Sequence, residues 1–246
     1  MTPLVLLHAF PLDSTMYAEV AGILGGGILA PDLPGFGGAP LPSGEPTLEA
    51  YADHVAAVLD AAGVERAIIG GTSMGGYVAM AFCNRHADRV SGLALIDTKA
   101  SADPAPVAEG RRAMAQLMTA ESTTQPLIEH VLPKLLGETT KGVSPDISSR
   151  VEGWVRHADP VGAAWAQQAM AARPDSLATL REVDVPSLVI VGEEDVLAPP
   201  IDAGVMAAAL TDTELVLIPA VGHLTPIEAP DEVASALQRL WHRVDG

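Results

Sequence analysis

Residues 67–76 of this 246-residue chain read Ala-Ile-Ile-Gly-Gly-Thr-Ser-Met-Gly-Gly, and an apolar stretch at 77–86 follows them directly. The run at 67–70 is typical of a strand buried on both faces, and the apolar stretch is typical of a buried helix. Ser73 therefore lies on a sharp turn from a strand to a helix. The five residues centred on it have the form Gly-x-Ser-x-Gly.

The chemistry of a serine nucleophile accounts for this pattern. A serine on so tight a turn has a strained backbone, and the neighbouring segments approach so closely that Gly71 and Gly75 must lack a Cβ. The amino terminus of the following helix adds positive potential where an oxyanion would form. Ser73 is thus the candidate nucleophile. The alternative is a serine that caps the helix, with glycines that serve only packing.

Short runs rich in Val, Ile and Leu recur along the chain without alternating with polar residues, as in parallel strands covered on both faces. They lie at 4–7, 28–30, 67–70, 92–96, 187–191 and 215–218. Helical patterns separate several of them, most clearly at 47–62, where Thr47 is the predicted N-cap and Gly63 the stop. Strands that alternate with helices predict an α/β fold with a doubly wound, mostly parallel sheet.

The alternation fails between the strand that ends at Ile96 and the strand that begins near Ser187. Proline and glycine instead separate a series of predicted helices, at about 104–119, 124–132, 145–157, 160–172 and 174–181. Because this interval is longer than any ordinary crossover, we expect an inserted helical lid at residues 99–181. Residues 1–98 and 182–246 then form the α/β core.

The net charge is unevenly distributed between these two parts. The chain has 14 Lys and Arg residues against 31 Asp and Glu residues, a formal charge of −17. Residues 99–181 contain nine of each sign and are neutral, so the core carries the whole excess. A protein this acidic is repelled by phosphate backbones and anionic membrane surfaces, and we therefore expect neither nucleic acid nor a membrane as a partner.

The remaining composition favours a cytoplasmic protein. The single cysteine, Cys83, cannot form an internal disulfide. The apolar amino-terminal residues lack a basic segment and a cleavage site, and they are expected to form a strand. No segment reaches the roughly 18 uninterrupted apolar residues of a membrane span.

A serine nucleophile needs a base, and position along the chain separates the seven histidines. Five fall in helix patterns, where a surface role is preferred: His54, His86, His130, His157 and His242. His223 instead lies on the loop after the last predicted strand. Because open α/β sheets place their sites at the carboxyl ends of their strands, His223 is the candidate base.

The acid that orients the base is expected at another strand end. Asp195 follows the strand at 187–191 by a short turn that can fix its side chain, and it is the preferred acid. Glu194 is a less favoured substitute. Asp97, at the end of the strand at 92–96, is an alternative acid, although capping the start of the insertion at Thr98 is the simpler role.

Ser73, Asp195 and His223 occur in this order, each after a strand, and the arrangement resembles the α/β-hydrolase fold superfamily. Two loops add to the resemblance. The segment His8-Ala9-Phe10-Pro11-Leu12 is similar to the family's His-Gly-x-Pro loop, with alanine in place of glycine. Asp32-Leu33-Pro34-Gly35-Phe36-Gly37 is similar to its Asp-x-Pro-Gly-x-Gly loop. The match covers residues 4–100 and 183–240.

The resemblance has consequences for the fold and the site. Within the superfamily, the core is similar to small bacterial lid-bearing serine esterases, including the 3-oxoadipate enol-lactonase and cofactor-free haloperoxidase groups. The first strand matches the family's third, which implies a sheet of about six strands. The backbone N–H groups of Phe10 and Met74 would form the oxyanion hole. No metal and no other cofactor is implied, and Ser73 argues against the dehalogenase and epoxide hydrolase branches, which use an aspartate nucleophile.

The expected reaction is the hydrolysis of a small-molecule carboxylic ester or lactone through an acyl-enzyme on Ser73, with His223 as base and Asp195 as orienter. Two other hypotheses stay open. One is a small-molecule sensor of the same fold with little turnover. The other is a perhydrolase, or cofactor-free haloperoxidase, which Pro11 beside the oxyanion loop permits.

Side chains of the insertion are candidates for substrate binding. Either they line an apolar acyl pocket above Ser73 or they form the insertion's own core: Trp154, Trp165, Met114 and Met118. Four arginines could anchor a substrate carboxylate, although solvated helix faces are the simpler interpretation: Arg111, Arg112, Arg150 and Arg156.

Overall fold

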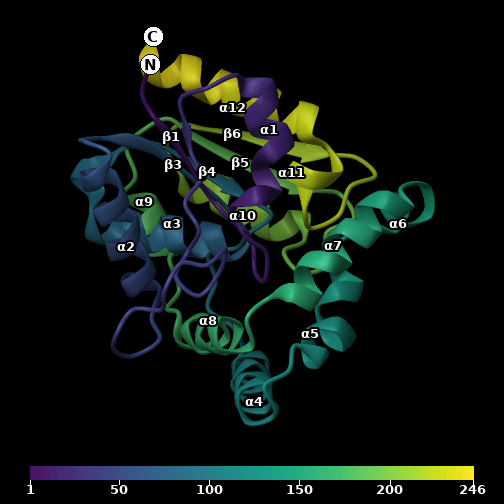
Figure 1. The fold of residues 1–246 in the computed structure, drawn as a ribbon. Coiled ribbons are helices and arrows are strands. Elements are labelled where there is room, and N and C mark those ends of the chain that lie inside the picture. Colours follow the sequence, from purple (N-terminus) through teal and green to yellow (C-terminus); the bar gives the residue numbers. More distant parts are fainter.

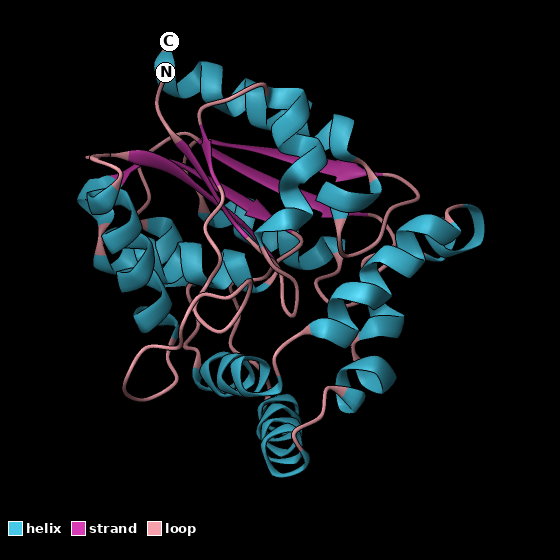
Figure 2. Cartoon of the chain, in the orientation of Figure 1, coloured by secondary structure: helices cyan, strands magenta, loops and turns pink.

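Six strands form a single, entirely parallel sheet in the computed structural model, which describes all residues from 1 to 246 (Figure 1, Figure 2). In chain order the strands are β1 (Leu4–Leu7), β2 (Ile28–Leu29), β3 (Ala67–Thr72), β4 (Val90–Ile96), β5 (Ser187–Gly192) and β6 (Thr213–Ile218). The order across the sheet is β2-β1-β3-β4-β5-β6, and every neighbouring pair is parallel. The predicted α/β class and strand number are confirmed.

Helices cover both faces of the sheet. They are α1 (Ala18–Leu24), α2 (Leu48–Ala61), α3 (Met74–Arg85), α10 (Pro200–Ala209), α11 (Thr225–Glu228) and α12 (Pro230–Asp245), with 3₁₀ turns at Ser14–Tyr17 and Ala87–Arg89. Helices α1 and α12 pack together on one face, and α2, α3 and α10 lie on the other (Figure 1). The strand order reverses direction at β1, which opens a crevice between the carboxyl ends of β1 and β3.

Local sequence explains where these elements begin and end. The hydroxyl of Thr47 accepts a hydrogen bond from the backbone N–H of Ala50 and caps α2, and Gly63, with a φ of +66°, follows its end. Every residue of β1, β3 and β5 is buried, as their unbroken apolar runs predict. The edge strand β6 differs, because Leu215 and Leu217 are about half exposed. The prediction that this strand is buried on both faces was wrong: α10 packs on it, but the face that carries Leu215 and Leu217 stays open to solvent.

A second group of helices lies between β4 and β5 in the chain. It comprises α4 (Ala105–Glu121), α5 (Gln125–His130), a 3₁₀ turn (Leu132–Lys134), α6 (Glu138–Val143), α7 (Pro145–His157) and α8 (Pro160–Ala172). We call residues 105–172 the helical insertion. Helix α4 packs on α8, and the group lies beside the sheet domain (Figure 1). The short helix α9 (Leu177–Arg181) instead packs on α3 and α10.

A buried ion pair joins the two chain segments that lead into and out of the insertion. Arg173, which follows α8, binds Asp103, in the loop before α4, through Nη1 at 2.7 Å and Nη2 at 2.8 Å. Its guanidinium also lies 4.1 Å from the ring centroid of Tyr77 on α3. Arg111 Nε contacts the same carboxylate at 2.7 Å. Burial raises the pKa of Asp103, but Arg173 and Arg111 outweigh burial and hold the pKa below its ordinary value.

Replacing Asp103 by alanine is expected to lower the free energy of unfolding by about 3 kcal/mol at neutral pH, because Arg173 would stay buried without a counter-charge. The side chains of Asp103 and Arg173 are only 1% and 3% exposed. Because the folded pKa of Asp103 is lowered, the loss should shrink in acid as the wild-type carboxylate becomes protonated. Urea unfolding at two pH values measures both effects.

The matched control is Asp60→Ala, which removes the partner of Arg89 from a pair whose aspartate side chain is 67% exposed. That variant should lose less than about 1 kcal/mol. An Asp103→Ala variant as stable as the control would show that Arg173 does not need its partner.

None of the helices combines the length and the hydropathy that crossing a membrane requires.

Candidate active site

The turn between β3 and α3 holds Ser73 in a strained conformation, with φ +56° and ψ −112°. Such a positive φ is rare for a residue other than glycine. A Cβ on Gly71 would lie 2.2 Å from the carbonyl carbon and oxygen of Gly75, and a Cβ on Gly75 would lie 2.0 Å from the carbonyl oxygen of Leu7. Both flanking glycines are therefore required by close backbone approach, and the turn projects Ser73 from the carboxyl edge of the sheet.

Three strand ends bring Ser73, His223 and Asp195 together. The Oγ atom of Ser73 lies 2.8 Å from Nε2 of His223, and Nδ1 of His223 lies 2.7 Å from Oδ2 of Asp195. These residues follow β3, β6 and β5, respectively. His223 and Asp195 are each 3% exposed, so water is largely excluded from the bond between them.

The carboxylate of Asp195 fixes the proton positions in this chain of hydrogen bonds. Its Oδ1 atom accepts from the backbone N–H groups of Leu197 at 2.8 Å and Ala198 at 3.0 Å. Burial raises the pKa of Asp195, but the adjacent His223 and the two amides outweigh burial and hold the pKa below its ordinary value. An ionised Asp195 requires a proton on Nδ1 of His223. Nε2 is then free to accept the proton of the Ser73 hydroxyl.

Asp97 has neither of the two roles that its position suggested. It is fully buried and accepts from the N–H of Gly192 at 3.2 Å, and from the N–H and hydroxyl of Thr225 at 2.9 and 2.7 Å. It makes no hydrogen bond to His223, and it does not cap at Thr98, whose hydroxyl donates to the carbonyl of Ser73. Burial, together with the charge of Asp195, raises the pKa of Asp97 well above its ordinary value. Asp97 thus joins the loop before Asp195 to the loop after His223.

Glu228 positions the same histidine loop from the other side, a role that the sequence did not indicate. Its carboxylate accepts from the N–H groups of Gly222 at 3.1 Å and Leu224 at 3.1 Å, the two neighbours of His223. It also accepts from the N–H of Gly137 in the helical insertion, at 2.9 Å. The alternative acid Glu194 faces away from the triad and accepts from the N–H and hydroxyl of Thr139.

The two candidate oxyanion donors lie on either side of the crevice. Met74 is the first residue of α3, so its N–H has no acceptor within the helix. Phe10 follows β1 and lines the same cavity as Ser73. The loop that carries Phe10 is held by the buried His8, whose Nε2 accepts from the N–H of Leu33 at 2.9 Å. His8 thereby links the two loops that resemble family motifs.

A cavity of about 400 Å³ opens above Ser73 and His223, between the strand ends and the helical insertion. Met114 lines it, as does Met170, whereas the other three predicted pocket residues do not. Trp165 packs edge-to-face on Tyr51, with ring centroids 4.8 Å apart, and Met118 is fully buried. Their apolar character serves packing of the insertion rather than contact with a ligand.

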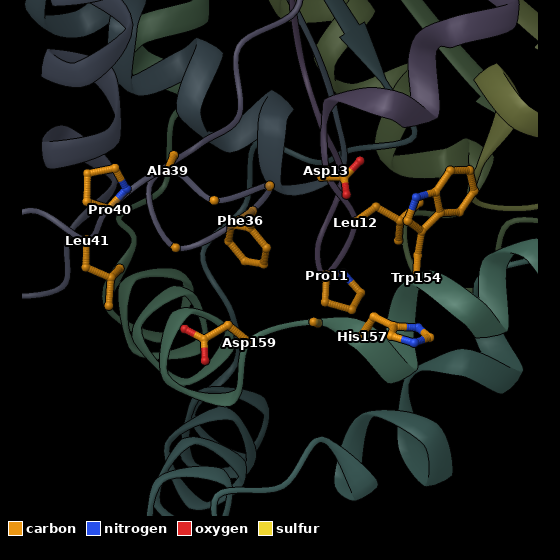
Figure 3. A pocket seen from close by; sticks show the side chains of 14 residues that line it. Pro11, Leu12, Asp13, Phe36, Ala39, Pro40, Leu41, Trp154, His157 and Asp159 are labelled. Atoms are coloured by element: carbon orange, nitrogen blue, oxygen red, sulfur yellow. The ribbon is translucent and has the colours of Figure 1, made fainter.

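Trp154, the third exception, borders a separate cavity of about 470 Å³ (Figure 3). There Trp154 and His157 of α7 face the loop that carries Pro11 and Leu12. The indole N–H of Trp154 donates to the hydroxyl of Thr15 at 3.0 Å. Ser73 does not line this second cavity, which is therefore separate from the candidate active site.

Of the four arginines considered as carboxylate anchors, only Arg111 lines the cavity of Ser73. The others have partners elsewhere: Arg112 donates to the carbonyl of Ala171, Arg150 pairs with Glu19, and Arg156 pairs with Glu152. Two cations that the sequence did not single out, Lys99 and Lys134, also line this cavity. The place of Lys99, just after β4, is the signal that could have identified it. No three His, Cys, Asp or Glu side chains come close enough to hold a metal ion.

A serine on a strained strand-to-helix turn, hydrogen-bonded to a histidine and through it to an aspartate at the carboxyl edge of a parallel sheet, defines an α/β hydrolase. The chain belongs to the alpha/beta hydrolase family, whose model matches residues 4–236. This agrees with the resemblance that the sequence motifs carry.

Three relatives show how closely the chain follows known members. A thermophilic esterase from Thermogutta terrifontis, solved with malate bound, is 36% identical with a TM-score of 0.94, over 99% of this chain and 90% of that one. The enol-lactonase from Burkholderia xenovorans LB400 is 26% identical with a TM-score of 0.88, over 98% and 92%. Haloalkane dehalogenase 2 of Mycobacterium tuberculosis is 29% identical over 96% of this chain and 86% of its own length.

Proposed function

We propose that this α/β hydrolase cleaves a small-molecule carboxylic ester or lactone through an acyl-enzyme on Ser73. The observation that supports it most directly is the continuous chain of hydrogen bonds from Ser73 Oγ to His223 and on to Asp195, at 2.8 and 2.7 Å, beside a cavity that can hold a small molecule. A serine hydroxyl is a poor nucleophile at neutral pH unless such a base removes its proton.

The reaction begins when Ser73 Oγ attacks the carbonyl carbon of the substrate and Nε2 of His223 takes the hydroxyl proton. Asp195 stabilises the resulting imidazolium and holds its orientation. As the tetrahedral intermediate collapses, the imidazolium gives its proton to the departing alkoxide. Water, deprotonated by the same nitrogen, then attacks the acyl-enzyme, and the carboxylic acid and free Ser73 are released.

Charge on the carbonyl oxygen is the main electrostatic demand of both steps. We assign the N–H groups of Phe10 and Met74 to this oxygen, because both are backbone donors that border the crevice at Ser73. Donors that are already in place need no rearrangement during the reaction, and one such donor is typically worth about 100- to 1,000-fold in rate.

Two of the relatives support ester chemistry, since one is described as an esterase and the other as an enol-lactonase. The similarity to a haloalkane dehalogenase does not extend to the nucleophile, because that branch uses an aspartate where this chain has Ser73. The helical insertion contributes Val107, Met114 and Leu135 to the cavity wall, and we propose that it acts as the lid of the site.

Covalent labelling combined with turnover tests this function. A fluorophosphonate probe should modify the protein once, and peptide mass spectrometry should place the adduct on Ser73. The unlabelled protein should hydrolyse many equivalents of p-nitrophenyl acetate at neutral pH. Labelling without repeated turnover would favour a sensor of the same fold, and an adduct on another residue would contradict the assignment of the nucleophile.

A further inference from the structure

The cavity above Ser73 is lined by cations and by no carboxylate. Lys99, Arg111 and Lys134 all border it, together with His130, whereas no Asp or Glu does. The whole chain has only three lysines and a formal charge of −17, yet two of those lysines lie at this cavity. The second cavity has the opposite character, since Asp13 and Asp159 border it without any Lys or Arg. The local excess of positive charge therefore runs against the composition of the protein.

Neither lysine is neutralised by a protein carboxylate. Lys141 pairs with Glu138, but neither Lys99 nor Lys134 has a carboxylate oxygen within 4.0 Å of its ammonium group. The only hydrogen bond of the Lys99 ammonium is to the carbonyl oxygen of Leu197, at 3.4 Å. An ammonium group has three N–H donors, so most of this donor capacity is free.

Arg111 is held in a fixed orientation at the same cavity. Its Nε donates to Asp103 at 2.7 Å and its Nη1 donates to the buried Gln167 at 2.9 Å. The Nη2 group makes no hydrogen bond within the protein. A guanidinium fixed by two partners, with a third nitrogen free, is well suited to receive a carboxylate oxygen.

These cations come from three separate segments of the chain. Lys99 follows β4, Arg111 lies on α4, and Lys134 ends the 3₁₀ turn at Leu132–Lys134. Like charges at one cavity repel one another, and an anion placed among them would remove that cost. We propose that the cavity selects substrates that carry a carboxylate in addition to the ester or lactone group. This inference rests on the proposed function and names its substrate class.

The corresponding reaction is the hydrolysis of a monoester of an aliphatic dicarboxylic acid. For a methyl ester, methanol departs as the serine is acylated. Water then hydrolyses the acyl-enzyme, and the product is a dicarboxylate. Monomethyl succinate, glutarate and adipate provide a series in which the free carboxylate lies at increasing distance from the ester. Methyl hexanoate has the chain length of monomethyl adipate without its charge.

The kcat/KM of the best monomethyl ester is expected to exceed that of its uncharged counterpart by at least about tenfold. The ratio of the two values should fall by about tenfold in Lys99→Met, and by about the same factor in Lys134→Met. This is the size expected for one charge-assisted hydrogen bond. The matched control is Lys141→Met, because the third lysine pairs with Glu138 and does not line the cavity. That variant should leave both values unchanged. Thermal unfolding of each variant shows whether it is folded.

Adipate binding provides a readout that does not depend on catalysis. Calorimetric titration should show adipate bound by the wild-type protein and by Lys141→Met, and about tenfold more weakly by Lys99→Met or Lys134→Met. Binding with this pattern but without ester turnover would uphold the anion site and reject the proposed reaction. Turnover of neutral esters without preference for the charged ones, and without a change of ratio in the variants, would overturn the inference alone. Adipate affinities in Lys99→Met and Lys134→Met that equal that of the wild type would also overturn the inference.

Discussion

Replacement of Ser73 by alanine is expected to lower kcat for ester hydrolysis by about 10⁵- to 10⁶-fold. The substitution removes the proposed nucleophile, and the remaining groups can assist water only weakly. Residual catalysis would come from the oxyanion donors and from binding of the substrate. Steady-state hydrolysis of p-nitrophenyl acetate measures kcat, and labelling by the fluorophosphonate probe should disappear in the same variant.

Ser43→Ala is the matched control, because Ser43 is exposed and makes no hydrogen bond. It should retain wild-type turnover and wild-type labelling. Ser73→Ala should also keep its fold, since the turn conformation is enforced by the glycines beside it and alanine only loses a hydroxyl. A variant that keeps more than about 1% of the activity would show that another group is the nucleophile.

Asp195→Asn is expected to lower kcat by about 10⁴-fold while the protein stays folded. The direction of the effect follows from the two backbone donors that Asp195 already satisfies. The amide oxygen of asparagine must stay with the N–H groups of Leu197 and Ala198, so its NH₂ group turns toward His223. Nδ1 of His223 then has to accept, and the ring proton moves to Nε2. A protonated Nε2 cannot take the proton of Ser73.

The neighbouring carboxylate provides the control for this prediction. Glu194→Gln changes a side chain that binds Thr139 rather than the imidazole, and its kcat should stay within about threefold of the wild type. The pH dependence of kcat/KM for both variants shows whether the base still works. Wild-type activity in Asp195→Asn would contradict its role as orienter and would direct attention to the nearby buried carboxyl of Asp97.

Local sequence was sufficient for the features that short segments determine. The strand-to-helix turn at Ser73 follows from the glycines two residues away on each side. A Cβ on Gly71 or Gly75 would clash with backbone atoms nearby in the chain or on β1. The burial of β3 and β5 follows from apolar runs that no polar residue interrupts. Each of the three triad candidates follows a strand, and this position was enough to predict that they meet at one edge of the sheet.

These local sequence patterns do not predict how distant segments of the chain pack together. Trp154 finds its partner at Thr15, 139 positions away in the chain, and nothing in the local sequence of either residue indicates the contact. The sequence suggested that Asp97 is a triad acid or a cap, because only its neighbours in the chain could be taken into account. Its actual donors, Gly192 and Thr225, lie 95 and 128 positions further on. The sequence shows which side chains of the insertion are apolar, but it does not show which of them line a cavity and which pack in the core.

The carboxylate of Glu228 serves the histidine loop and the helical insertion at once. Gly137 and Gly222 lie so close that a Cβ on Gly222 would come within 2.0 Å of the nitrogen of Gly137, and both N–H groups donate to Glu228. Movement of the insertion away from this point would take one of three N–H donors from Glu228 and leave the two that flank His223. The loop that carries the candidate base and the helical insertion thus share a single carboxylate acceptor.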